Sequence, residues 1–116
     1  MDIDYKAKSR FDASHAPIGV PGCRNGDGHT WHVSAGASGP LERVESGIFL
    51  VRGSGGLRTE LLAVVAEING RHLEDMMPGV LTTNEGIAAW LLERLPTAHE
   101  VTVETRTESA TVHRRR

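Results

Sequence analysis

The 116-residue sequence has few of the residues on which a large core or a covalent framework depends. It contains one cysteine, so no disulfide can form within the chain, and a reducing compartment is its natural environment. Two Trp, two Phe and one Tyr stand against thirteen Gly. A core built mainly from Val, Leu, Ile and Ala is small, and such chains often gain burial by pairing with copies of themselves. We therefore expect a single domain, residues 1–116, in a homo-oligomer.

The sequence also lacks long apolar runs and a strong charge of one sign. No run approaches the roughly 20 apolar residues that a membrane helix needs, and the first residues lack the pattern of a signal peptide. The formal net charge of −2 does not indicate nucleic acid or an acidic membrane as partner. The three arginines at residues 114–116 indicate a solvated tail. We expect a soluble cytoplasmic domain.

Two stretches near the N-terminus alternate in polarity. Residues 5–15 place Phe11 and His15 on an apolar face and charged side chains on the other, which predicts a half-buried antiparallel strand. Residues 29–38 alternate in the same way, and Gly39-Pro40 is expected to end that strand. Residues 46–51 fit either a third short strand or a loop, and the glycines of residues 53–56 predict a flexible break.

The middle of the chain has helical periodicity. Apolar residues recur at helical spacing over residues 57–68, and Asn69-Gly70 is a plausible C-terminal stop. A second helix is expected to begin with Thr83 or Asn84 as its cap and to end at Leu95, before a proline.

The remaining segments complete the predicted architecture. Residues 71–82 are expected to form a loop, and residues 101–107 and 110–113 two short strands. The order ββααββ favours an α+β fold, in which an antiparallel sheet carries two helices on one face.

One cluster of residues could bind a metal. Asp27 and His29 are two residues apart on a strand, so their side chains point the same way, and His15 faces the core side of the neighbouring strand. Two imidazoles and one carboxylate can hold zinc and leave a fourth position open. The parity of His32 puts it on the opposite face. From these residues alone, Asp27 could also serve a tight turn, and His15 could be a hydrogen-bonded core histidine.

The single cysteine lies beside this cluster. Cys23 precedes Asp27 by four residues, in a glycine-rich loop. A thiol near a metal can have a lowered pKa and act as nucleophile or base, but an incidental loop residue fits the sequence equally well.

Phe11-Asp-Ala-Ser-His15, Cys23 and Asp27-Gly-His29-Thr-Trp31 occur in this order, followed by Thr83-Asn-Glu85 and Val101-Thr-Val-Glu104-Thr105. With these motifs the sequence resembles the 6-pyruvoyltetrahydropterin synthase / 6-carboxytetrahydropterin synthase family over essentially the whole chain. The resemblance implies the tunnelling fold (T-fold), in which subunits join their sheets into a barrel. It also implies a Zn²⁺ cofactor and hexamers built from two trimers, with sites at subunit interfaces.

The resemblance assigns a metal set and exposes two departures. It implies His15, Asp27 and His29 as zinc ligands, although the family has a third imidazole where this chain has Asp27, and it makes Cys23 catalytic. Asn69-Gly70 occupies the positions of the family's Asp-His proton relay, and neither residue can carry a proton. His72, two residues on, could take over that role.

Substrate-binding residues also follow from the resemblance. Thr83, Asn84 and Glu85 lie at the start of the second helix, and Glu104 or Thr105 is the pterin anchor. Glu85 could equally be a carboxylate that interacts favourably with the helix dipole. The strand alternation favours Thr105 and the downstream spacing favours Glu104; a one-residue slip exchanges them.

The sequence therefore predicts a divergent zinc-dependent carbon-oxygen or carbon-carbon lyase. Its substrate would be a pterin or a related small heterocycle, with an altered reaction because the Asp-His relay is missing. The alternative is a catalytically inactive binding or scaffold subunit of a T-fold oligomer.

Overall fold

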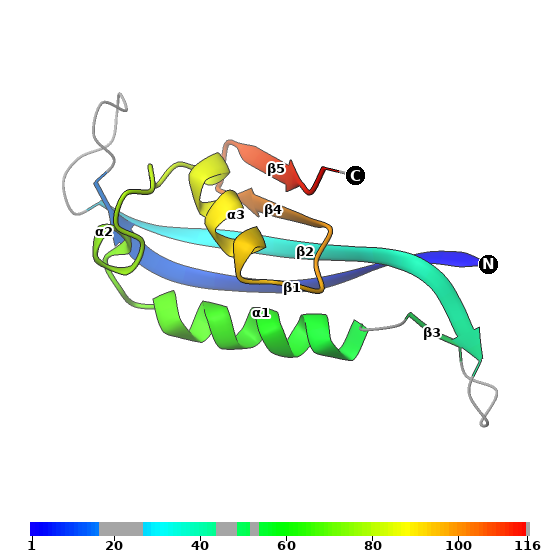
Figure 1. The fold of residues 1–116 in the computed structure, drawn as a ribbon. Helices are drawn as coiled ribbons and strands as arrows, with labels where there is room; N and C mark the ends of the chain where they lie inside the picture. The colour runs from blue at the N-terminus through cyan, green and yellow to red at the C-terminus, as the bar shows by residue number, and fades with distance from the viewer. Residues whose placement is uncertain (17–26, 44–48, 52–53, 116) are drawn as a thin grey trace.

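The computed structural model describes residues 1–16, 27–43, 49–51 and 54–115, which form an antiparallel sheet and three helices (Figure 1). The elements in chain order are β1 (Asp2–His15), β2 (Asp27–Arg43), β3 (Phe49–Val51), α1 (Ser54–Ile68), α2 (Leu73–Met76), α3 (Asn84–Glu93), β4 (Glu100–Glu104) and β5 (Ser109–His113). None of these helices is long and apolar enough to cross a membrane.

The strands pair in the order β1-β2-β4-β5, and β3 adds to the end of β2. β1 pairs with β2 along its whole length, from Asp2 opposite Pro40 to His15 opposite Asp27. β4 joins β2 after the three helices have intervened, and it continues into β5 as a hairpin. β4 thus lies beside the middle of β2 with β5 outside it, and both ends of β1 and β2 extend beyond these short strands (Figure 1).

One face of the sheet carries the core. The alternate residues of β1, β2 and β4 that face α1 and α3 are buried, as predicted for β1 and β2. The largest of them is Trp31, which stacks on Phe11 with ring centroids 5.2 Å apart. The intervening residues of β1 are mostly charged and exposed, and those of β2 and β4 are mostly polar, so the other face is polar. Both long helices thus cover one face of an α+β sheet, as the sequence predicted.

The prediction that Gly39-Pro40 ends the second strand was wrong, because β2 continues to Arg43. Pro40 has no N–H to donate, and a strand tolerates it where that N–H would need no partner. Leu41 donates its N–H to the carbonyl of Met1 on the β1 side, so the nitrogen of Pro40 faces the other side. There β4 ends its pairing with β2 at Gly36, so no ladder bond is lost.

Other boundaries also differ from prediction, and α3 ends at Glu93 rather than at the predicted Leu95. α1 begins at Ser54, within the expected break, because the first turn of a helix makes few internal hydrogen bonds and tolerates glycine there. The expected loop over residues 71–82 contains α2, a single turn held by the fully buried Leu73. β4 ends at Glu104, and Thr105 donates its N–H to the carbonyl of Glu108 to close the hairpin.

Candidate metal and proton-transfer site

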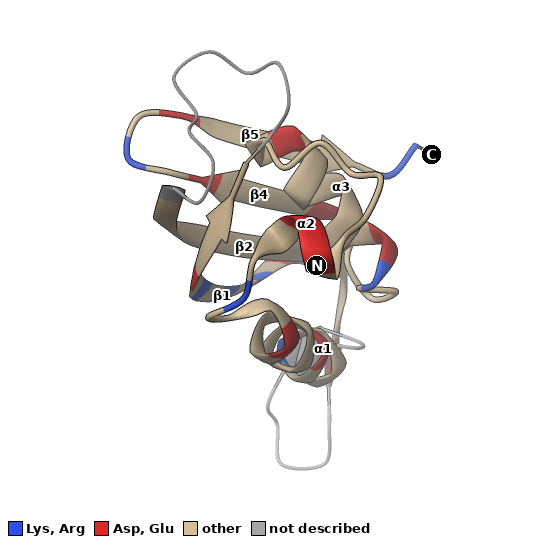
Figure 2. Ribbon diagram, turned by 90° about the vertical axis from the view of Figure 1, so that its left-hand side faces the viewer, with Lys and Arg blue, Asp and Glu red and all other residues tan. Residues whose placement is uncertain are grey.

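The register of β1 and β2 brings the predicted metal ligands to one end of the sheet. His15 is opposite Asp27, and His29 is opposite Ala13, two residues before His15. Figure 2 views this end of the molecule, with the acidic residues of α2 in front. The side chain of Asp27 and the whole of Cys23 lie outside the described residues, so their predicted roles stay predictions.

His15 is buried, with 7% of its surface exposed. Its Nδ1 lies 2.8 Å from the carbonyl oxygen of Thr82, in the segment that leads into α3. A carbonyl can only accept, so Nδ1 carries the proton and Nε2 carries a lone pair. Nε2 is itself buried and has no hydrogen-bond partner among the described residues. A buried imidazole nitrogen with a free lone pair is the state in which histidine binds a metal.

His29 lies directly beside this nitrogen-bearing ring. The two imidazole centroids are 4.7 Å apart with an interplanar angle of 82°, and both rings meet the edge of Trp31. His29 is exposed, whereas Trp31 is buried beneath it. The indole therefore forms an apolar floor beneath the exposed His29 and packs against the buried His15.

The described side chains contain no complete group of three metal ligands. The two that are described nevertheless fit zinc, because one imidazole has its tautomer fixed by a backbone carbonyl and a second is adjacent. The predicted third ligand, Asp27, starts the strand that carries His29.

Asn69 and Gly70 end α1 and attach it to β1. The Asn69 side-chain oxygen accepts the N–H of Asp12 at 3.0 Å, and Gly70 donates its N–H to the Asp12 carbonyl. Gly70 has φ of +75°, the left-handed conformation that commonly ends helices. The predicted helix stop is confirmed, and both residues have structural roles.

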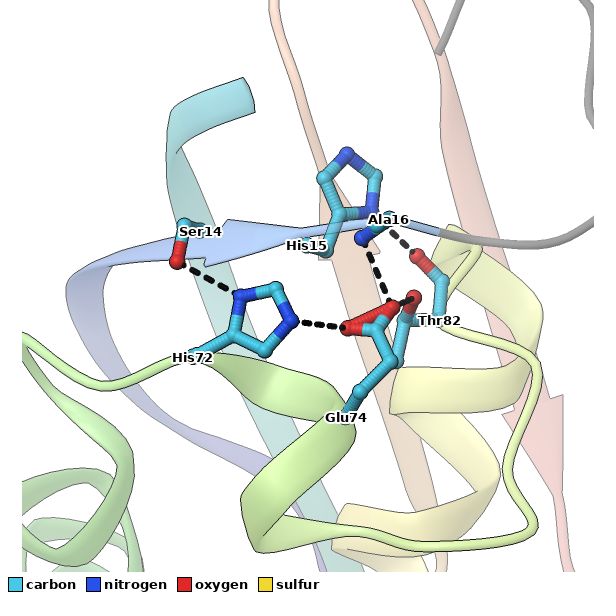
Figure 3. A network of polar contacts seen from close by, with 6 residues as sticks. All are labelled: Ser14, His15, Ala16, His72, Glu74 and Thr82. Carbon is cyan, nitrogen blue, oxygen red and sulfur yellow. Dashed lines mark hydrogen bonds and ion pairs between the residues drawn. The ribbon is translucent and has the colours of Figure 1, made fainter. Parts of the chain in front are cut away.

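His72 lies at the edge of β1, where residues 71–72 form a short parallel bridge to Ser14. Figure 3 shows its imidazole between two side chains. Nδ1 of His72 is 2.8 Å from the Ser14 hydroxyl oxygen, and Nε2 is 3.5 Å from a carboxylate oxygen of Glu74.

Glu74 connects His72 and Ser14 to the two histidines of the candidate metal site. One of its oxygens accepts the N–H of Ala16 at 2.8 Å and the hydroxyl of Thr82 at 2.7 Å. Burial acts to raise the pKa of Glu74, but these hydrogen bonds and the nearby His72 outweigh it and hold the pKa below the ordinary value. Thr82 thus holds Glu74 by its side chain and His15 by its carbonyl.

The predicted substrate-binding residues fall into two groups. Thr83 caps α3 by accepting the N–H of Gly86, as predicted, and the exposed Glu85 lies in the first turn. Asn84 is buried and donates to the carbonyl of Glu108 at 3.2 Å, with the hydroxyl of Thr105 at 3.5 Å.

Glu104 is the last residue of β4, and Thr105 follows it in the turn to β5. The strand pairs regularly up to Glu104, whose partner on β2 is His32, so both point to the polar face, as the parity of His32 predicted. A hollow of about 700 Å³ at the strand ends is nevertheless lined by Glu104, Thr105 and His29 together. The structure therefore brings both anchor candidates near one metal-ligand candidate.

Three residues of this site were not singled out from the sequence: Ser14, Glu74 and Thr82. The alternation of residues 5–15 places Ser14 on the polar face of the strand, and nothing in the sequence indicated a function for it there. Glu74 and Thr82 lie in a segment that was expected to be a loop, and their partners are far away in the chain.

These features define an α+β protein with a two-histidine pocket at one end of an antiparallel sheet. The family model of 6-pyruvoyl tetrahydropterin synthase matches residues 4–115, and the chain belongs to this family. A comparison with curated proteins gives no match.

Solved structures show the same fold. The Caenorhabditis elegans 6-pyruvoyl tetrahydropterin synthase superposes with a TM-score of 0.81 at 19% identity, covering 99% of this chain and 97% of that one. The synthases of Plasmodium vivax and Plasmodium falciparum each give 0.72, at 18% and 15% identity. They cover 98% and 97% of this chain, respectively, and 98% of their own. At these identities the likeness supports the T-fold alone.

Proposed function

We propose that the protein is a zinc-dependent lyase that acts on a pterin or a related small heterocycle. The observation that carries this proposal is the buried Nε2 of His15, which lies beside the ring of His29 and has no hydrogen-bond partner in the part of the chain that the structure describes. A core histidine with a purely structural role would be expected to satisfy both nitrogens, because an unsatisfied buried polar atom costs about 1–3 kcal/mol.

The residues of the chain divide the work as follows. His15, Asp27 and His29 would hold the zinc ion, which when bound would polarise a carbonyl or hydroxyl of the substrate. Cys23 would act as acid, base or nucleophile, and His72 would carry protons. The substrate would be bound by Glu104 or Thr105 at the strand ends and by Thr83, Asn84 and Glu85 at the start of α3.

The reaction is proposed to differ from that of other members of the family. Asn69 and Gly70 cannot transfer protons, and both are engaged in ending α1. Removing triphosphate from dihydroneopterin triphosphate, or remodelling its side chain, needs proton transfers at neighbouring carbons. We therefore expect slow turnover of that compound, and an altered reaction on a related heterocycle.

A second candidate is a binding or scaffold subunit without catalysis. The same use of Asn69 and Gly70 in ending a helix favours it, because the relay has been replaced by a structural device. In either case we expect a trimer-based homo-oligomer of the T-fold kind, up to a hexamer, in which neighbouring subunits complete the site.

The test is metal analysis of the purified full-length protein, followed by assays with dihydroneopterin triphosphate. About one zinc per chain is expected, and less than about a tenth of an equivalent would refute the metal site. Turnover at the rate of an intact family member would refute the argument from Asn69 and Gly70. Zinc without conversion of any reduced pterin would favour the scaffold. A Cys23→Ala variant with unchanged turnover would remove Cys23 from the mechanism.

A further inference from the structure

The chain carries a hydroxyl, an imidazole and a carboxylate in series at the edge of β1 (Figure 3). Ser14 and His72 are 58 residues apart in sequence, and their hydroxyl oxygen and Nδ1 are 2.8 Å apart. The other ring nitrogen faces Glu74 at 3.5 Å. We propose that Ser14, His72 and Glu74 form a proton relay in which the Ser14 hydroxyl meets the substrate. This inference deepens the proposed function and depends on it for the identity of the substrate.

The direction of the relay follows from the state of Glu74. Its pKa lies below the ordinary value, so the carboxylate is ionised near neutral pH. Its second oxygen is buried and accepts no hydrogen bond among the described residues, and Nε2 of His72 faces it at an ion-pair distance of 3.5 Å. An ionised oxygen only accepts, so Nε2 of His72 carries a proton. In a neutral His72, Nδ1 then has the lone pair and accepts the hydroxyl proton of Ser14.

The accessible end of the relay is Ser14. Both nitrogens of His72 are engaged, whereas the Ser14 oxygen keeps lone pairs that can receive a second proton. Ser14 and His72 line a hollow of about 540 Å³, and His29 lines it too. Gly28 is opposite Ser14 in the register, and a Cβ added there would meet no atom within 4 Å. A small molecule in this hollow can therefore approach Ser14 and His29 together.

The proton transfers balance without any other reactant. A substrate O–H bond breaks, its electron pair stays on the substrate oxygen, and the proton forms a new bond to the Ser14 oxygen. The original Ser14 proton passes to Nδ1 of His72. Glu74 stays ionised and stabilises the resulting imidazolium, which is the role of the carboxylate in hydroxyl–imidazole–carboxylate triads. The reverse transfers return a proton to the product.

The relay is held next to the candidate metal pocket by Thr82. The same residue donates its hydroxyl to Glu74 and accepts Nδ1–H of His15 with its carbonyl. Glu74 also receives the N–H of Ala16, which directly follows His15. Glu74 is thus a positioning residue, and the arrangement supplies the proton carrier that Asn69 and Gly70 cannot supply.

The first test is ¹⁵N NMR of the His72 ring in the full-length protein, with the signal assigned by a His72→Gln variant. We expect a proton on Nε2 and a bare Nδ1 at neutral pH, and a loss of this preference in Glu74→Gln. A proton on Nδ1 of neutral His72 in the unaltered protein would overturn the relay, whether or not the protein turns over any substrate. Failure of the proposed function and failure of the relay are therefore separate outcomes.

The second test uses dihydroneopterin triphosphate as the probe. Ser14→Ala is expected to lower kcat by about 10²-fold, because a lost general acid–base group costs this much, with little change in KM. Ser14→Thr, which keeps a hydroxyl, is expected to restore most of kcat.

The matched control is Ser38→Ala. Ser38 also places its hydroxyl beside a histidine Nδ1, that of His99 at 3.2 Å, but at the other end of the sheet. It is expected to leave kcat unchanged. An unchanged kcat in Ser14→Ala, in a protein that turns over the probe, would overturn the role of Ser14.

Discussion

His15 meets His29 edge to face, with ring centroids 4.7 Å apart, and the Thr82 carbonyl fixes the tautomer of the buried ring. The pair is therefore oriented before any metal arrives. An oriented ligand binds with less loss of side-chain entropy than a free one, so these two residues should dominate the affinity for zinc.

Loss of either imidazole should abolish tight zinc binding. We expect His15→Ala and His29→Ala each to weaken zinc binding by at least about 100-fold in a chelator competition. His15→Ala should also lower the free energy of unfolding by about 1–3 kcal/mol, because the Thr82 carbonyl loses its donor. The control is His32→Ala, whose side chain points to the polar face. Equal zinc affinity in His29→Ala and His32→Ala would exclude His29 as a ligand.

Gly70 is expected to resist substitution for conformational reasons. Its φ of +75° is unfavourable for residues with a Cβ, so Gly70→Ala should lower the free energy of unfolding by about 1–2 kcal/mol. Gly70→His would place an imidazole at the position of the family's Asp-His pair, and it should lower the free energy of unfolding by the same amount. Urea unfolding measures both.

Gly39→Ala is the matched control for Gly70. A Cβ at Gly39 meets no atom within 4 Å, and its φ lies outside the left-handed region. We expect a change of less than about 0.5 kcal/mol. If Gly70→Ala were no more destabilising than Gly39→Ala, the left-handed conformation at Gly70 would not be required.

Alternation predicted the fold well because β1 and β2 each bury a single face. Phe11 and Trp31 fall on that face by parity alone, and so do His15 and His29. The continuation of β2 through Pro40 was not predictable from the sequence. It depends on whether a neighbouring strand pairs with β2 on the side that the proline nitrogen faces. A four-residue helix such as α2 is also too short for a periodicity of 3.6 to reveal it.

The proton-transfer group was beyond sequence reasoning for a different reason. Ser14 and His72 meet because residues 71–72 bridge to the edge of β1 after α1 has run alongside that strand (Figure 1). Nothing in the spacing of Ser14, His72 and Glu74 indicates that bridge. Only the absence of a relay at Asn69-Gly70 pointed to His72, and that inference came from the family pattern.

Glu104 provides a test of how a heterocycle is held. It lines the same hollow as His29, and a carboxylate can accept two N–H groups from the edge of a pterin. We expect Glu104→Gln to weaken binding of dihydroneopterin by about tenfold or more, since a hydrogen bond to a charged group is worth about 1.5–3 kcal/mol. Calorimetric titration of the full-length protein measures this.

The control for Glu104 is Glu100→Gln, at the start of the same strand. Glu100 lies 3.3 Å from His113 and lines a separate hollow. Unchanged binding in Glu104→Gln together with weakened binding in Thr105→Val would assign the anchor to Thr105.

Glu74 should make the stability of this end of the sheet depend on pH. Its folded pKa lies below 4.5, the ordinary value, so folding favours the ionised form. The contribution is fully present above pH 4.5 and is lost as the pH falls through the folded pKa. Glu74→Gln should lower the free energy of unfolding at pH 7 by about 1–3 kcal/mol, because hydrogen bonds to a charged acceptor are lost.

The difference between the unaltered protein and Glu74→Gln is therefore expected to shrink as the pH falls below about 4.5. Urea unfolding across this range measures it. Glu93→Gln, an exposed carboxylate in the last turn of α3, serves as the control and should show no such trend. A difference that grew as the pH fell below about 4.5 would mean that burial dominates at Glu74 and raises its pKa. The ionised carboxylate would then be disfavoured in the folded protein, which would weaken its ability to orient His72 toward Ser14.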